Sequence, residues 1–147
     1  MAARPSVVAV KSAAFTPDGG EVVNILGNAQ AVITPREVWR EQSVRDGNTG
    51  VSTDDAEVEV VKDVTLMSDD VDNFILGLTD NDWGGLVIKG SLIGDDTNTV
   101  LQWTFTKMQV EPEQSLTMPG QKGQRLPFGR VFRALEGSAE TKEKAAS

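Results

Sequence analysis

Residues 99–111 read TVLQWTFTKMQVE, and this stretch decides the class of fold. Its apolar and polar residues alternate, which is the two-residue period of a strand with one buried face. Leu101, Trp103 and Phe105 lie on one side of this strand, which we expect to face the core. After Lys107 the apolar positions shift to Met108 and Val110, and such a shift is typical of a β-bulge or a change of side.

The segments around this stretch are also short strands separated by turn residues. Residues 85–93 and 99–111 flank the turn sequence GDDTN, so they are predicted to form a β-hairpin. Further strands are expected at residues 6–15, 21–26, 29–34, 37–44, 56–66 and 124–135. Eight or nine strands of this kind indicate a mainly β protein, an antiparallel β-sandwich or barrel.

One short α-helix is predicted beside the sheet, at residues 68–78. Ser68 is a good N-cap, and Asp69 and Asp70 occupy the first turn, where the helix dipole favours negative charge. The apolar residues then follow at helical spacing: Val71, Phe74, Ile75 and Leu78. Residues 1–136 are therefore expected to form one β domain, whereas the polar residues 137–147 are expected to be a flexible C-terminal tail.

Composition excludes several kinds of chemistry. The 147 residues include 14 Lys and Arg, 22 Asp and Glu, no His and no Cys, which gives a net charge of −8. Thiolate chemistry is impossible, and the usual general base is missing. The negative charge also disfavours a grip on nucleic acid. We therefore expect no catalytic residue, no metal, no cofactor and, without a long apolar run, no membrane segment.

A polar segment at residues 45–55, RDGNTGVSTDD, is predicted to be a long loop or hairpin tip. The strand before it, residues 37–44, has no cleanly apolar face, so we expect it to cross a contact surface. Trp39 beside Arg40 suits a contact aromatic, or equally a half-buried sheet residue. Arg130 and Arg133, with Arg125, form the main basic cluster, which could pair with an acidic neighbouring copy or remain solvated.

The order of these features resembles that of bacteriophage tail tube (major tail) proteins. A β-rich N-terminal part leads to the polar loop at 45–55, a strand at 56–66 and the helix at 68–78. A hairpin with a Trp/Phe-containing strand follows at 86–110. A Pro- and Ser-containing segment at 111–118 then precedes a final strand with the sequence LPF, at 125–135. The resemblance covers residues 7–135.

This resemblance implies a structural subunit of a phage virion. Such proteins form hexameric rings whose strands join into an inner barrel, and the rings stack into a tube. DNA passes through this tube without specific binding. The partners would be other copies of the chain and other tail proteins, in the virion tail and, during assembly, in the host cytoplasm. The loop that reaches a neighbour would comprise Arg45, Asp46, Gly47, Asn48, Thr49, Gly50, Val51 and Ser52.

Two other classes remain open from the sequence. A small β binding module, such as a capsid decoration protein, a tail terminator or a carbohydrate-binding domain, would be a stable monomer or trimer. An enzyme would need a pair of carboxylates and a divalent metal.

Overall fold

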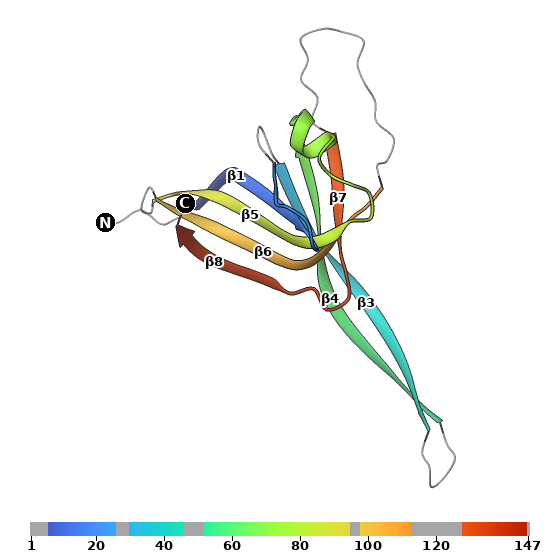
Figure 1. The fold of residues 1–147 in the computed structure, drawn as a ribbon. Helices are drawn as coiled ribbons and strands as arrows, with labels where there is room; N and C mark the ends of the chain where they lie inside the picture. Colours follow the sequence, from blue (N-terminus) through green and yellow to red (C-terminus); the bar gives the residue numbers. More distant parts are fainter. Residues whose placement is uncertain (1–5, 26–29, 46–51, 95–97, 113–127, 147) are drawn as a thin grey trace.

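A computed structural model describes residues 6–25, 30–45, 52–94, 98–112 and 128–146, and only the backbone at residues 8, 40–45 and 52–57 (Figure 1). In this part of the chain nearly all regular structure is β. The strands are β1 (Ser6–Pro17), β2 (Val23–Ile25), β3 (Gln30–Arg45), β4 (Ser52–Ser68), β5 (Trp83–Ile93), β6 (Thr99–Val110), β7 (Phe128–Ala134) and β8 (Glu140–Ala146). The prediction of a mainly β, antiparallel fold is confirmed.

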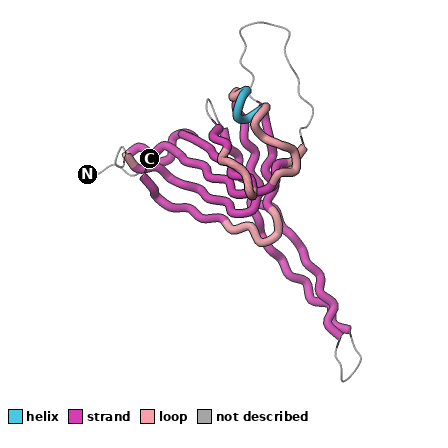
Figure 2. Tube along the Cα trace, in the orientation of Figure 1, coloured by secondary structure: helices cyan, strands magenta, loops and turns pink. Residues whose placement is uncertain are grey.

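All eight strands belong to one antiparallel sheet with the order β2-β1-β5-β6-β7-β4-β3, and β8 also pairs with β6. The sheet divides at β6, because residues Thr99 to Phe105 pair with β8 whereas Met108 to Val110 pair with β7. We call β1, β5, β6 and β8 the wing, and β7, β4 and β3 the upright (Figures 1 and 2). Among the described strands the end strands β2 and β3 do not pair, so the sheet is not closed into a barrel.

The change of phase in β6 is a β-bulge, as the sequence predicts. Leu86 pairs with Phe105 and Gly84 pairs with Met108, so three steps along β6 match two along β5. Thr106 and Lys107 are both exposed at the bulge, whereas Phe105 and Met108 on either side of it are buried. Because of the bulge, one half of β6 can pair within the wing and the other half can pair with the upright.

The core fills the junction between wing and upright. Phe15 of β1 and Phe132 of β7 meet there, with ring centroids 5.3 Å apart at an interplanar angle of 53°. Other fully buried side chains come from β4, β5, β6 and the helical turn: Val64, Leu66, Leu86, Phe105, Met108 and Phe74. Of the residues expected in the core on β6, Phe105 is buried, whereas Leu101 and Trp103 lie half-buried on the wing.

The predicted α-helix at 68–78 is wrong in extent and type. The chain forms a single π-helical turn, η1 (Val71–Ile75), whose N-cap is Asp70 rather than Ser68. The Ser68 hydroxyl instead accepts a hydrogen bond from the Asp70 amide at 3.1 Å. Val71 is exposed, and of the four apolar residues at helical spacing only Phe74 and Leu78 are buried. At Gly77 the chain turns so close to the Asn73 carbonyl oxygen that a Cβ would lie 2.5 Å from it.

The prediction of a flexible tail at residues 137–147 is also wrong. Residues Glu140 to Ala146 form β8, which pairs with β6 from Phe105 to Thr99. The side chains of β8 are mostly exposed, so the strand carries no apolar pattern by which the sequence could reveal it. Backbone hydrogen bonding along β6 holds it in place. Within the expected last strand, 124–135, residues Phe128–Ala134 form β7, and residues 124–127 lie outside the described residues.

Candidate interaction site

A two-stranded arm projects from the upright (Figures 1 and 2). Strands β3 and β4 pair without a register shift from Gln30 opposite Met67 to Arg45 opposite Ser52. Strand β7 covers the edge of β4 only from Val64 to Ser68. We define the arm as residues 36–45 of β3 and 52–61 of β4. At about 3.3 Å per residue it is roughly 30 Å long, and no third described strand joins it.

The arm changes the interpretation of the predicted polar loop at 45–55. Arg45 and residues 52–55 belong to the two strands, so the loop is shorter than expected. Of the predicted contact residues, Asp46, Gly47, Asn48, Thr49, Gly50 and Val51 lie outside the described residues. The side chains of Arg40, Arg45 and Ser52 also lie outside the description. Arg45 and Ser52, the last described residues on either side of this gap, pair with each other at the far end of the arm.

One face of the arm carries exposed apolar side chains. Trp39 lies directly opposite Val58, and Val60 is the next residue on the same face of β4. Their exposed fractions are 64%, 45% and 58%. We call these three residues the apolar stripe. Of the two readings of Trp39, the structure favours the contact aromatic, because a tryptophan exposed beside two valines leaves apolar surface for a partner.

The base of the arm is held by a charged network. Arg36 Nε donates to Asp63 Oδ2 at 2.8 Å, and Arg36 Nη2 donates to Asp63 Oδ1 at 3.3 Å. Arg36 Nη2 also donates to the carbonyl oxygen of Ala134, whose amide donates to Asp63 Oδ1, both at 2.9 Å. These bonds tie β3 and β4 to the end of β7. Bidentate pairing adds geometric specificity to this contact, which lies where the arm leaves the body.

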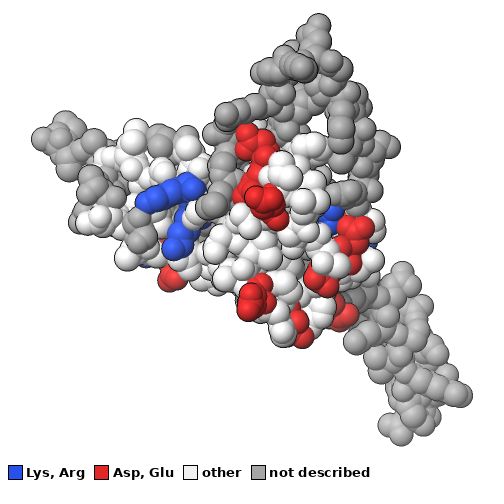
Figure 3. All heavy atoms as spheres, turned by 45° about the horizontal axis from the view of Figure 1, so that its top comes forward, with Lys and Arg blue, Asp and Glu red and all other residues white. Residues whose placement is uncertain are grey.

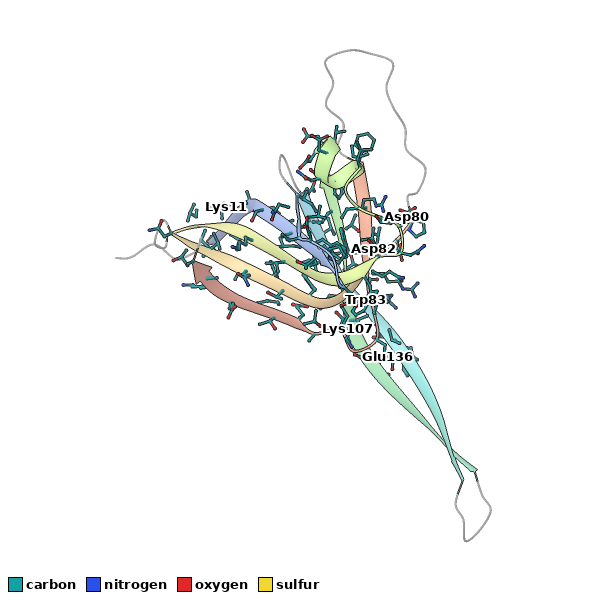
Figure 4. All side chains as sticks on the ribbon, in the orientation of Figure 1. Lys11, Asp80, Asp82, Trp83, Lys107 and Glu136 are labelled. Atoms are coloured by element: carbon teal, nitrogen blue, oxygen red, sulfur yellow. The ribbon has the colours of Figure 1, made fainter. Side chains whose placement is uncertain are left out.

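The predicted basic contacts lie in two different environments. Arg130 is buried, and its Nη2 donates to Asp80 Oδ1 at 2.6 Å, so this residue holds β7 to the loop before β5. The structure thus gives Arg130 an internal role, instead of the surface position expected of a contact residue. Arg133 is exposed and lines an open hollow of about 380 Å³ beside Arg36 and Glu136. Figure 4 shows Lys107 and Glu136 in this region, where the arm leaves the body.

A second hollow lies between the wing and the first residues of β3. It has a volume of about 270 Å³ and an open mouth, and we call it the apolar groove. Trp103 is part of its wall. Lys142 Nζ lies 5.4 Å from the centre of the Trp103 ring, and Trp103 Nε1 donates to Glu140 Oε1 at 3.2 Å. The other main lining residues are Val7, Val10, Ala31, Ile33 and Ile88.

Charge is divided between the arm and the wing. Residues 36–61, which include the arm, contain seven Asp and Glu against three Arg, a net charge of −4. The four strands of the wing contain five Lys against two Glu, a net charge of +3. On the face shown in Figure 3 the wing carries a group of basic side chains, and most of the other charged side chains are acidic.

The outer strands of the sheet differ in how open their edges are. Strand β8 presents the charged sequence TKEK, β1 has two irregularities near Lys11, and β3 contains Pro35. Each of these features hinders the addition of another strand. Within the described ranges these edges are therefore poorly suited to strand addition. The exposed side chains of the arm are a more suitable contact surface.

Among the described residues, no three Asp and Glu side chains come together as a metal site would require. None of the described helices has the length and hydropathy needed to cross a bilayer. Comparisons with protein-family models, with curated proteins and with solved structures gave no match to this chain. The features that bear on function are therefore the arm, the groove and the distribution of charge.

Proposed function

We propose that this protein is a structural subunit that assembles with copies of itself, in the manner of a bacteriophage tail tube protein. Copies would form rings, which the resemblance implies are hexameric, and the rings would stack into a tube. The protein would act through contact alone and catalyse no reaction. Its partners would be further copies and other tail proteins, in the virion tail and, before that, in the host cytoplasm.

The arm is the observation that carries this proposal. A lone two-stranded hairpin is at best marginally stable in water, and this one also exposes Trp39, Val58 and Val60. Contact with another molecule would cover these side chains and stabilise the arm. A contact between the arm of one copy and a different surface of the next copy would be heterologous. Such contacts generate a ring when the rotation closes and a filament when it does not.

The net charge of −8 supports a conduit for DNA. An acidic wall repels the phosphate backbone, so that DNA would slide along it, whereas a basic wall would retain it. The proposed tube would therefore pass DNA without specific binding.

The experiment is assembly of the purified full-length chain, followed by negative-stain microscopy and light scattering over a wide range of concentrations. We expect rings or tubes. A protein that stays monomeric at every concentration would overturn the proposal. A monomer or trimer that bound only a preformed capsid or tail would instead favour the decoration or terminator class.

An arm-shortened variant tests which part of the chain mediates assembly. Replacing residues 37–60 by Asn-Gly removes Trp39, Val58 and Val60 and joins Arg36 to Val61, which are paired in the native ladder, by a turn that suits a hairpin. The variant should retain the circular dichroism spectrum of the body and lose assembly. Normal tubes from this variant would contradict a role for the arm.

A further inference from the structure

We infer that the apolar groove of one copy receives the apolar stripe of another copy. This inference rests on the proposed self-assembly and specifies the two surfaces that meet. The donor surface is Trp39, Val58 and Val60 on the arm. The acceptor surface lies between the wing and the start of β3, and is lined by Val7, Val10, Ala31, Ile33, Ile88 and Trp103.

The size and chemistry of the groove suit inserted side chains. Its volume of about 270 Å³ is below the range of roughly 300–1,000 Å³ typical of small-molecule sites. Most of its wall is aliphatic or aromatic, and no cluster of charged side chains lies inside it. An exposed tryptophan flanked by two valines provides the apolar surface that would exclude water from such a groove.

The stripe of a copy cannot enter the groove of the same copy. Ile33 in the groove wall and Trp39 in the stripe are six residues apart on the one continuous strand β3. At about 3.3 Å per residue they are held roughly 20 Å apart. The arm also leads away from the wing, where Lys11 lies (Figures 1 and 4). The two surfaces can therefore meet only between copies.

Charge favours the same pairing. The segment that contains the arm, residues 36–61, has a net charge of −4 and the wing has one of +3. Glu37 is exposed on the face of the stripe, and the half-exposed Lys142 lies over Trp103 in the groove wall. Opposite charges of this kind steer association and set orientation, and their effect falls as salt is added. Because every copy would have one donor and one acceptor, the assembly would have a single direction around its ring or along its filament.

The test uses two variants, each defective in one surface. Trp39→Ser removes the donor side chain, and Val7→Glu places a carboxylate at the mouth of the acceptor. Both residues are exposed, so both variants should fold. Trp83→Ser and Val71→Glu are matched controls, because these residues are also exposed and lie outside both surfaces. If Val7→Glu does not fold, Lys142→Glu serves as the acceptor variant.

We expect each defective variant alone to remain monomeric, with association weakened at least about tenfold, and both controls to assemble like the wild type. An equimolar mixture of the two defective variants should form a one-to-one dimer, because one still has a working groove and the other a working arm. Light scattering and sedimentation would measure this, and added salt should weaken the dimer.

The failure of this inference can be distinguished from that of the proposed function. If the wild type assembles but the mixture stays monomeric, or if both variants assemble normally, the arm does not enter the groove and self-assembly still stands. If the wild type never assembles, both proposals are overturned.

Discussion

Strand β4 runs through two regions in which the same residue type has opposite surroundings. Val64 is fully buried, whereas Val60, four residues earlier on the same face of the same strand, is 58% exposed. Each valine lies beside an aromatic residue across a strand pair. Phe132 of β7 lies opposite Val64, and Trp39 of β3 lies opposite Val58, next to Val60.

The difference between the two regions is whether a second layer covers the face. At Val64 the wing supplies Phe15 against Phe132, but nothing described covers Val60. A β-branched, alternating sequence therefore makes a strand in both places and buries its side chains in only one. An uncovered apolar face on a projecting hairpin would favour non-specific association unless a partner occupies it.

The largest effect that would test this comparison is on stability. Phe132→Ala should lower the free energy of unfolding by about 3–5 kcal/mol, because it leaves a cavity in the junction. Trp39→Ala should change it by less than about 0.5 kcal/mol, because that ring is mostly exposed. Urea unfolding of both variants would measure the two values. Similar losses in the free energy of unfolding for the two variants would mean that the arm contributes to stability as much as the junction does.

A smaller loss of stability is expected from a substitution in the wing, where β1 and β5 approach each other closely. A Cβ at Gly84 would lie 1.9 Å from the Thr16 carbonyl oxygen, so Gly84→Ala must push β1 and β5 apart. We expect a loss of about 1–3 kcal/mol in the free energy of unfolding. Gly85→Ala is the control, since its Cβ would meet only the Phe105 carbonyl oxygen at 3.7 Å. Equal thermal stability of the two variants would contradict this close approach.

The smallest effect concerns β8, which lies at the edge of the body and exposes most of its side chains. Removing residues 138–147 should cost on the order of 1 kcal/mol, because the lost hydrogen bonds are partly offset by the entropy regained. It should also expose Trp103, whose ring lies against Lys142 and Glu140. Tryptophan emission should therefore move to longer wavelength. An unchanged spectrum and stability would mean that β8 is not docked in solution.

The sequence correctly predicts several local features. The alternation in β6, its bulge after Lys107 and the β5–β6 hairpin are all confirmed, because each is determined by neighbouring residues. The helix at 68–78 fails for a physical reason. Its apolar spacing is helical, but a helix of fewer than four turns is only marginally stable without packing. Here only Phe74 and Leu78 are buried in the core.

For the candidate site, local composition left Trp39 either as a contact aromatic or as a half-buried sheet residue, and it predicted the polar segment beyond it. The groove was not predicted, because its walls come from β1, β3, β5 and β6, and no single segment carries its pattern. The surface position predicted for Arg130 is wrong for a related reason. Its partner Asp80 is fifty residues away in the chain, so sequence alone cannot distinguish an arginine buried in an internal ion pair from one at a surface contact.

By itself the sequence determined most of the extended segments, though not β8, several of the turns, and the negative net charge, since these depend on residue type and short-range order. Only the tertiary structure decided which apolar faces are covered. Burial depends on whether distant strands meet, and here they meet at Val64 and leave Val60 to water. The arm and the groove exist because a single open sheet cannot cover all of its own faces.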